Sequence, residues 1–289
     1  MQGLIGPLKE LAEFEELCKN KKKDVGMIRV CGCVNSQKSH MMYALGDGCK
    51  YKVIACSSEA KAKQIYEEYR FLDAAISFYP AKDLLFYQAD IRSKELVSQR
   101  MQVIQAVLKG EPITVVASFD AFMDALLPKE MIKSRVIKIC SDETLNLDEL
   151  SVKLAQCGYD REIEVAGPGQ FAVRGGILDV YPLTEELPVR IELWGDEVDS
   201  IRSFDPESQR SVEQLEEVVL YPATEIVLTP EQVEMGLERI TKSEKSYEKT
   251  LREQFQTEEA NRIRSITEEF KENLKDCMAT GSLDSYLTN

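Results

Sequence analysis

The feature that most constrains the fold of this chain is residues 158–205, in which apolar and polar side chains alternate. Such alternation is typical of strands that bury one face and leave the other polar. Across residues 189–194 the apolar set is Val189, Ile191 and Leu193, and the polar set is Arg190, Glu192 and Trp194. Gly195-Asp196 interrupts the run and Gly175-Gly176 separates two shorter runs upstream, so the pattern predicts two hairpins.

The polar side of this strand set is a candidate interaction surface. Arg190, Glu192 and Trp194 share it, and Arg161 and Arg174 lie on neighbouring segments. Arg and Trp are the residue types most enriched as anchors in protein interfaces. The alternative is a solvated sheet face whose charges pair across strands, which contributes little free energy. The residues alone leave both interpretations open.

Composition excludes several other functions. The formal net charge of −14 opposes non-specific nucleic-acid binding, which needs clustered Lys and Arg. The eight cysteines form no CxxC pair and the single His40 completes no familiar zinc set, so no metal or other cofactor is expected. We expect Cys31 and Cys33 to be buried thiols on a strand. No signal peptide or membrane-length apolar run is evident, which predicts a cytoplasmic protein without a membrane partner.

The first part of the chain, residues 1–120, reads as an α/β domain. Apolar spacing predicts a helix over Leu4–Asn20, and later helices alternate with strands. That order is typical of a parallel sheet covered on both faces. The expected strands are Met27–Cys31, Lys52–Cys56, Ala75–Tyr79 and Pro112–Ala117, and the expected later helices are Lys38–Leu45, Ser58–Arg70 and Lys94–Leu108.

A near match to a phosphate-binding loop lies between the first expected strand and the next helix. It begins at Gly32 and ends in Gln37-Lys38-Ser39, where the full pattern has a second glycine in place of Gln37. A glycine there lets the backbone approach phosphate closely, and a side chain obstructs that approach. No apolar strand ends in a paired Asp-Glu that could hold magnesium. We therefore expect Gly32, Gln37, Lys38 and Ser39 to form an inactive loop.

Two further parts are expected. We expect residues 121–206 to form a small α+β domain that contains the alternating strands. We expect residues 207–289 to form a mostly helical domain in which the first helix begins near Pro230. Apolar residues at helical spacing predict amphipathic helices after Pro230. A coiled coil is the minor alternative, because strict heptads are not sustained.

Three runs in the chain resemble a known family. These runs are FAVRGGILDVYP, PVRIELWGDEVDSIRSFD and SQRSVEQLEEVVLYPATE. They are similar to the amino-terminal region of bacterial transcription-repair coupling factors (Mfd), which is itself similar to the start of the excinuclease protein UvrB. The resemblance implies a degenerate RecA/P-loop-like first domain that has lost ATPase function, with an inserted small domain. It also implies that residues 207–289 pack on the first domain.

The resemblance further implies a role for the small domain. In this family that domain docks onto the excinuclease protein UvrA, so the segment is expected to be a non-catalytic adaptor. Arg161, Arg174 and Glu192 match docking positions, Arg190 is expected at the rim, and a fourth position, normally arginine, is Ala172. RNA polymerase and DNA are expected to bind through downstream domains of an ATP-dependent translocase.

Two alternatives depend on other features. Lys38-Ser39 after an expected strand would suit the nucleotide-binding half of an ATP-dependent DNA helicase. Direct lesion recognition would need an aromatic hairpin as a stacking platform. Residues 81–93 contain Phe86 and Tyr87 but are too short for two aromatic-rich strands. We expect neither activity.

Overall fold

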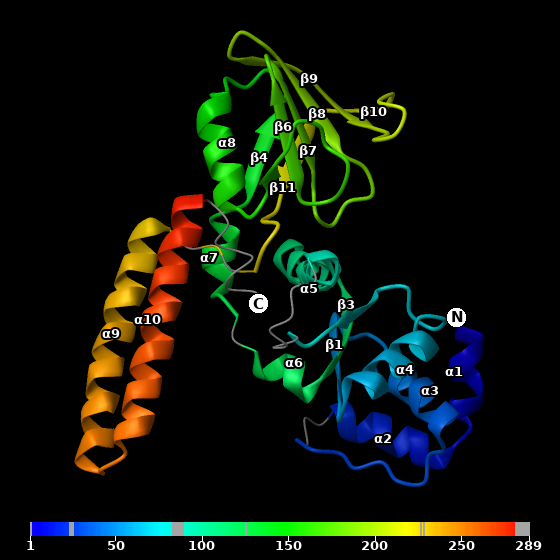
Figure 1. The fold of residues 1–289 in the computed structure, drawn as a ribbon. Coiled ribbons are helices and arrows are strands. Elements are labelled where there is room, and N and C mark those ends of the chain that lie inside the picture. Colours follow the sequence, from blue (N-terminus) through cyan, green and yellow to red (C-terminus); the bar gives the residue numbers. More distant parts are fainter. Residues whose placement is uncertain are drawn as a thin grey trace. The chain divides into compact units, whose positions relative to one another are not determined.

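The computed structural model describes residues 2–22, 26–82, 90–124, 126–225, 227 and 229–280. The chain divides into two compact units, residues 1–82 with 102–125, and residues 83–101 with 126–289. Helix α5 (Asp90–Lys109) begins in the second unit and ends in the first. Figure 1 shows the elements of both units. Phe86 and Tyr87 lie outside the described residues.

A parallel sheet forms the centre of the first unit. Its strands, in the order β1–β3–β2, are Tyr51–Cys56, Ile113–Ser118 and Ile76–Tyr79. All six residues of the central strand β3 are buried, and successive residues contribute to two different apolar clusters. Val115 clusters with Val103 of α5, and Val116 clusters with Ala62 of α4 (Glu59–Tyr69). The predicted parallel sheet with both faces covered is therefore confirmed.

The helices of the first unit follow its sequence signals. Ser58 caps α4 by accepting a hydrogen bond from the Lys61 N–H, and Ser118 caps α6 in the same way through the Ala121 N–H. The helices are α1 (Gln2–Lys9), α2 (Ala12–Lys22), α3 (Asn35–Leu45), α4 (Glu59–Tyr69), the second half of α5, and α6 (Phe119–Met123).

Two local predictions for the first unit are wrong. The strand expected at Met27–Cys31 is not formed within described residues 26–82, Met27 is 95% exposed, and Cys31 is exposed, not buried. Its sequence favours a strand, but among those residues the segment joins neither edge of the sheet. The helix expected over Leu4–Asn20 is broken between α1 and α2. The break lets Ile5 and Phe14 pack into one buried cluster. A straight helix would place these two side chains on opposite faces.

The second unit is built on a larger, mainly antiparallel sheet (Figure 1). Its strands, in the order β10–β9–β8–β7–β6–β5, are Ser211–Leu215, Glu197–Phe204, Val189–Trp194, Ile177–Tyr181, Gln170–Arg174 and Asp160–Arg161. β5 pairs with β6 in parallel, and the other neighbours are antiparallel. Both predicted hairpins, β6–β7 and β8–β9, are confirmed.

A second pair of strands and two short helices complete this domain. β4 (Ile137–Cys140) pairs with β11 (Glu217–Leu220) in antiparallel register. Helices α7 (Lys129–Lys133) and α8 (Leu147–Gln156) lie before the large sheet in the chain, and α8 buries Leu150 and Leu154. β10 and β11 both follow residue 206, so the strands of this unit continue past the boundary expected there. The three-part division of the chain stays a prediction.

Two long helices follow these strands. α9 (Pro230–Glu253) and α10 (Thr257–Thr280) pack against each other, as the apolar spacing predicts. Thr229 and Gln232 form a capping box at the start of α9, with Pro230 in the first turn. The buried Glu244 carboxylate accepts a hydrogen bond from Lys271 of α10 at 2.6 Å. The helices therefore form an antiparallel hairpin held by both apolar and charged contacts.

Candidate protein-binding surface

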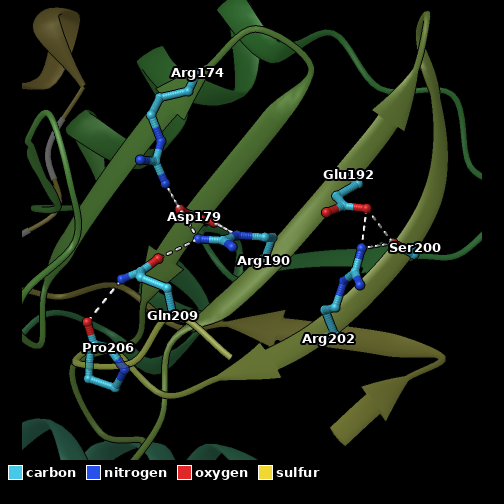
Figure 2. Close-up of polar contacts among 8 residues, drawn as sticks. All are labelled: Arg174, Asp179, Arg190, Glu192, Ser200, Arg202, Pro206 and Gln209. Carbon is cyan, nitrogen blue, oxygen red and sulfur yellow. Dashed lines mark hydrogen bonds and ion pairs between the residues drawn. The ribbon is translucent and has the colours of Figure 1, made fainter. Parts of the chain in front are cut away.

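Strand register brings the charged residues of the large sheet onto one face. Arg174 lies opposite Ile177, Asp179 opposite Arg190, and Arg190 opposite Arg202. Because directly opposed residues share a face, these side chains lie on one side of β6–β9. We define the polar face as Arg174, Asp179, Arg190, Glu192, Ser200 and Arg202, which Figure 2 shows as sticks.

Asp179 is the centre of the polar face. Its side chain is 2% exposed and accepts hydrogen bonds from two arginines. Arg190 donates from Nε to Oδ1 at 2.7 Å and from Nη2 to Oδ2 at 2.9 Å, and Arg174 donates from Nη2 to Oδ2 at 2.8 Å. The hydrogen bonds to Asp179 raise the pKa of Arg190 above its ordinary value. A buried carboxylate thus holds two guanidinium groups in fixed positions.

Arg190 is fixed further by its remaining neighbours. Its guanidinium carbon lies 4.4 Å from the centroid of the buried Phe204 ring. Its Nη2 also donates to Gln209 Oε1 at 2.8 Å, and the amide of Gln209 donates to the Pro206 carbonyl at 2.9 Å (Figure 2). Gln209 has a backbone φ of +57°, which is uncommon for this residue type. The turn therefore adopts an unfavourable conformation that aims an amide oxygen at Arg190.

Glu192 belongs to a second, more exposed pair on the same face. Its carboxylate accepts a hydrogen bond from Arg202 Nη2, and Ser200 Oγ donates to the same oxygen at 3.3 Å (Figure 2). The side chains of Glu192 and Arg202 are 31% and 34% exposed. Ion pairs at this exposure exchange readily with water or with another protein.

The structure brings three of the four predicted docking residues together. Arg174, Arg190 and Glu192 share the polar face. Arg161 does not, because its register partner is Phe171, whose ring is buried on the opposite face. Arg174 is 45% exposed and Arg190 only 17%, so Arg174 is the more accessible arginine.

The sequence prediction missed Asp179, Arg202 and Gln209. A signal for Asp179 exists, since a carboxylate inside the apolar run ILDVY needs a buried partner. Arg202 follows from extending the alternation of β8 to its hairpin partner β9. Gln209 lies in a turn between strands, and no local pattern connects it with Arg190.

The near-match phosphate loop has contacts unlike those of a phosphate cradle. Ser39 is buried, and its hydroxyl donates to Glu68 Oε2 at 2.9 Å. Gln37 Oε1 accepts the Val34 N–H at 3.2 Å, so this side chain caps α3. Gly32 precedes it with φ +86°, and Lys38 is exposed. Glu68 Oε2 and Gln37 Oε1 are hydrogen-bond acceptors at these positions, and a negatively charged carboxylate beside Ser39 disfavours a bound phosphate.

Two negative findings concern the part of the chain that the structure describes. Within it, no group of three or more His, Cys, Asp and Glu side chains is arranged to hold a metal ion. None of its helices combines the length and the apolar character that crossing a membrane requires.

Comparison with known proteins identifies the domain that carries the polar face. Residues 137–226 match the UvrB interaction domain family. The chain is 34% identical over 236 residues to the transcription-repair-coupling factor of Bacillus subtilis, covering 81% of this chain and 20% of that protein. It is 32% identical over 203 residues to the transcription-repair-coupling factor of Staphylococcus aureus strain Mu50, covering 70% and 17%.

The match is therefore extensive along this chain but partial along its relatives. The chain spans about a fifth of the length of the Bacillus subtilis relative. The polar face lies wholly inside the matched domain. Residues 137–226 form a UvrB interaction domain, within a longer stretch that is similar to transcription-repair-coupling factors.

Proposed function

We propose that this chain is a non-catalytic adaptor that recruits the excinuclease protein UvrA to stalled RNA polymerase for nucleotide excision repair in the bacterial cytoplasm. The observation that carries this proposal is the polar face within the UvrB interaction domain. Arginines prearranged by a buried carboxylate suit a protein partner, because little side-chain entropy remains to be lost on binding. Contacts with RNA polymerase and DNA are assigned to parts of the relatives beyond the matched fifth.

Arg174 is the contact that the geometry favours most. Its side chain is 45% exposed and bonded to Asp179 through Nη2. The remaining N–H groups of the guanidinium can donate two hydrogen bonds to a carboxylate of the partner in bidentate geometry. Because Arg174 is the most exposed cation of the face, it favours a carboxylate of the partner opposite it. Arg190 is assigned to positioning, Glu192 to the rim, and Arg161 to an edge contact outside the face.

The absence of catalysis is part of the same proposal. The three parallel strands and covering helices of the first unit are consistent with a degenerate RecA-like domain. The Ser39–Glu68 contact and the Gln37 cap favour a loop that does not bind nucleotide. ATP-dependent translocation is assigned to the remainder of the longer relatives.

Titration calorimetry of this chain with purified UvrA tests the proposal. Arg174→Glu is expected to weaken binding by at least about tenfold, the effect of losing a contact worth about 1.4 kcal/mol or more. Arg174→Gln, which creates no repulsion with Asp179, is expected to weaken it less. Lys153→Glu, an equal charge change on α8, is the matched control.

Each variant must also be shown to be folded, because an unfolded variant would lose binding for a different reason. Circular dichroism and thermal unfolding of each variant separate lost contacts from lost structure. A folded Arg174→Glu variant that binds with wild-type affinity would remove the polar face as the docking site. A wild-type chain that does not bind UvrA at all would remove the adaptor function.

A further inference from the structure

Trp194 is exposed although its residue type is normally well buried. It ends β8, and it is 85% exposed. Alternation along β8 places it on the same side as Arg190 and Glu192, and its register partner on β9 is Glu197. A tryptophan with a structural role covers apolar surface of its own domain. This indole covers little, so its large apolar area is available to another molecule.

Two glycines lie close to Trp194 along the backbone, Gly176 against Leu193 and Gly195 directly after the indole. The Leu193 N–H donates to the Gly176 carbonyl at 2.8 Å, which brings the β6–β7 turn against the end of β8. A Cβ atom on Gly176 would lie 2.9 Å from the Leu193 carbonyl oxygen, so this close approach requires glycine. Gly195, with φ +65°, follows Trp194 directly. Two glycines therefore lie at this end of β8, and neither has a side chain that could cover the indole.

The charges near Trp194 define the surface that it fits. Asp196 and Glu197 are exposed beside it in the hairpin, whereas Glu192 is paired with Arg202. Arg174 ends β6 at the glycine turn that lies against Leu193. A complementary surface therefore carries an apolar pocket for the indole, basic side chains opposite Asp196 and Glu197, and a carboxylate opposite Arg174.

We propose that Trp194 is the apolar anchor of the polar face and inserts into an apolar, basic-rimmed pocket of UvrA. This inference rests on the proposed function. It adds a source of binding affinity, because charge pairs contribute to specificity more than to affinity. Buried aromatic anchors surrounded by weaker polar contacts account for most of the affinity of typical interfaces. Trp194 is the apolar anchor, and Arg174 is the charged contact that fixes the orientation of the partner on the face.

The single tryptophan of the chain allows a direct test. The chain is labelled with 5-fluorotryptophan and titrated with unlabelled UvrA, so that one fluorine resonance reports on Trp194 alone. In the free chain the resonance is expected to shift between H₂O and D₂O, because the ring is exposed. In the saturated complex this solvent shift is expected to disappear. A resonance that stays solvent-sensitive in a saturated complex would overturn the anchor.

Substitution gives a second, independent measurement. Trp194→Ala is expected to weaken binding by about 30-fold or more, the level of an interface hot spot. Trp194→Phe is expected to retain part of that affinity. Phe255→Ala, at a 93% exposed aromatic in the α9–α10 turn, is the matched control and is expected to bind normally. Unfolding measurements check that each variant is folded.

The two proposals fail in different ways. If Trp194→Ala binds normally and Arg174→Glu does not, the anchor is wrong and the adaptor function stands. If the wild-type chain does not bind UvrA, both are overturned. If Phe255→Ala weakens binding as much as Trp194→Ala, exposure alone explains the loss, and the assignment of Trp194 as the anchor fails.

Discussion

The sheets of the two units differ in where their polar side chains lie. In the first unit β3 is buried along its whole length, and Thr114 at its start bonds with Asp73, which also pairs with Lys52. In the second unit the large sheet buries one face and gathers arginines and carboxylates on the other. A parallel sheet between helices offers no free face, whereas an antiparallel sheet covered on one side does. The proposed recognition surface therefore lies in the second unit.

The largest expected effect is a loss of stability when a buried ion pair away from the polar face is broken. Arg100 is fully buried on α5, and its Nη2 donates to Glu225 Oε2 at 3.0 Å. Glu225→Ala leaves a buried guanidinium without this carboxylate and is expected to lower the free energy of unfolding by about 3–5 kcal/mol. Urea unfolding followed by circular dichroism measures the change. Glu217→Ala, which breaks the exposed pair with Lys138, is the control, and equal losses would contradict the assignment.

The next effect separates the two clusters of the polar face. Asp179→Ala is expected to cost about 3 kcal/mol of unfolding free energy, because the buried arginine donors of Arg190 lose their acceptor. Glu192→Ala removes a half-exposed partner of Arg202 and is expected to cost under about 1 kcal/mol. The same urea titrations compare them. If Glu192→Ala is the more damaging change, Asp179 is not the centre of the face.

A smaller effect concerns pH and the first unit. Burial alone would raise the pKa of Asp73, but hydrogen bonds from Lys52, Thr114 and the Ala75 N–H outweigh burial and lower it below 3.8. A carboxyl whose pKa is lower when folded stabilises the fold above its unfolded pKa, and this contribution is lost as pH falls through the folded value. Wild type is therefore expected to lose stability relative to Asp73→Asn below about pH 4. Urea midpoints of both proteins, measured from about pH 6 to about pH 3, test this. A difference that stays constant would contradict it.

The smallest expected effect is at the near-match phosphate loop. Lys38→Ala is expected to leave nucleotide binding unchanged, because we expect none in the wild-type chain. Calorimetry with ATP and magnesium measures both proteins. Micromolar binding that disappears in Lys38→Ala would restore the helicase alternative and move function back to the first unit.

Local pattern predicted the parts of the fold that depend on neighbours in sequence. Alternation with the turns at Gly175-Gly176 and Gly195-Asp196 predicted both hairpins of the large sheet, and the apolar run PITVVA predicted β3. The strand expected at Met27–Cys31 was wrong, since strand propensity forms a strand only beside a partner.

The polar face shows the same limit at the level of side chains. Arg174, Arg190 and Glu192 could be predicted from alternation and resemblance. The role of Asp179 required the register of β7 with both β6 and β8, and that of Gln209 required the course of a turn. Arg161 lies away from this face because β5 runs parallel to β6 in a register that sequence spacing does not reveal.

The pairing of β4 with β11 has a consequence for how this domain can be moved between proteins. Ile137, where the segment that matches the domain family begins, lies opposite Leu220, near the end of that segment. Since the ends of the segment are adjacent, closing it into a host loop costs little chain entropy. The proposed recognition surface therefore lies on a segment whose two ends meet, which is the geometry that insertion into a loop of another scaffold requires.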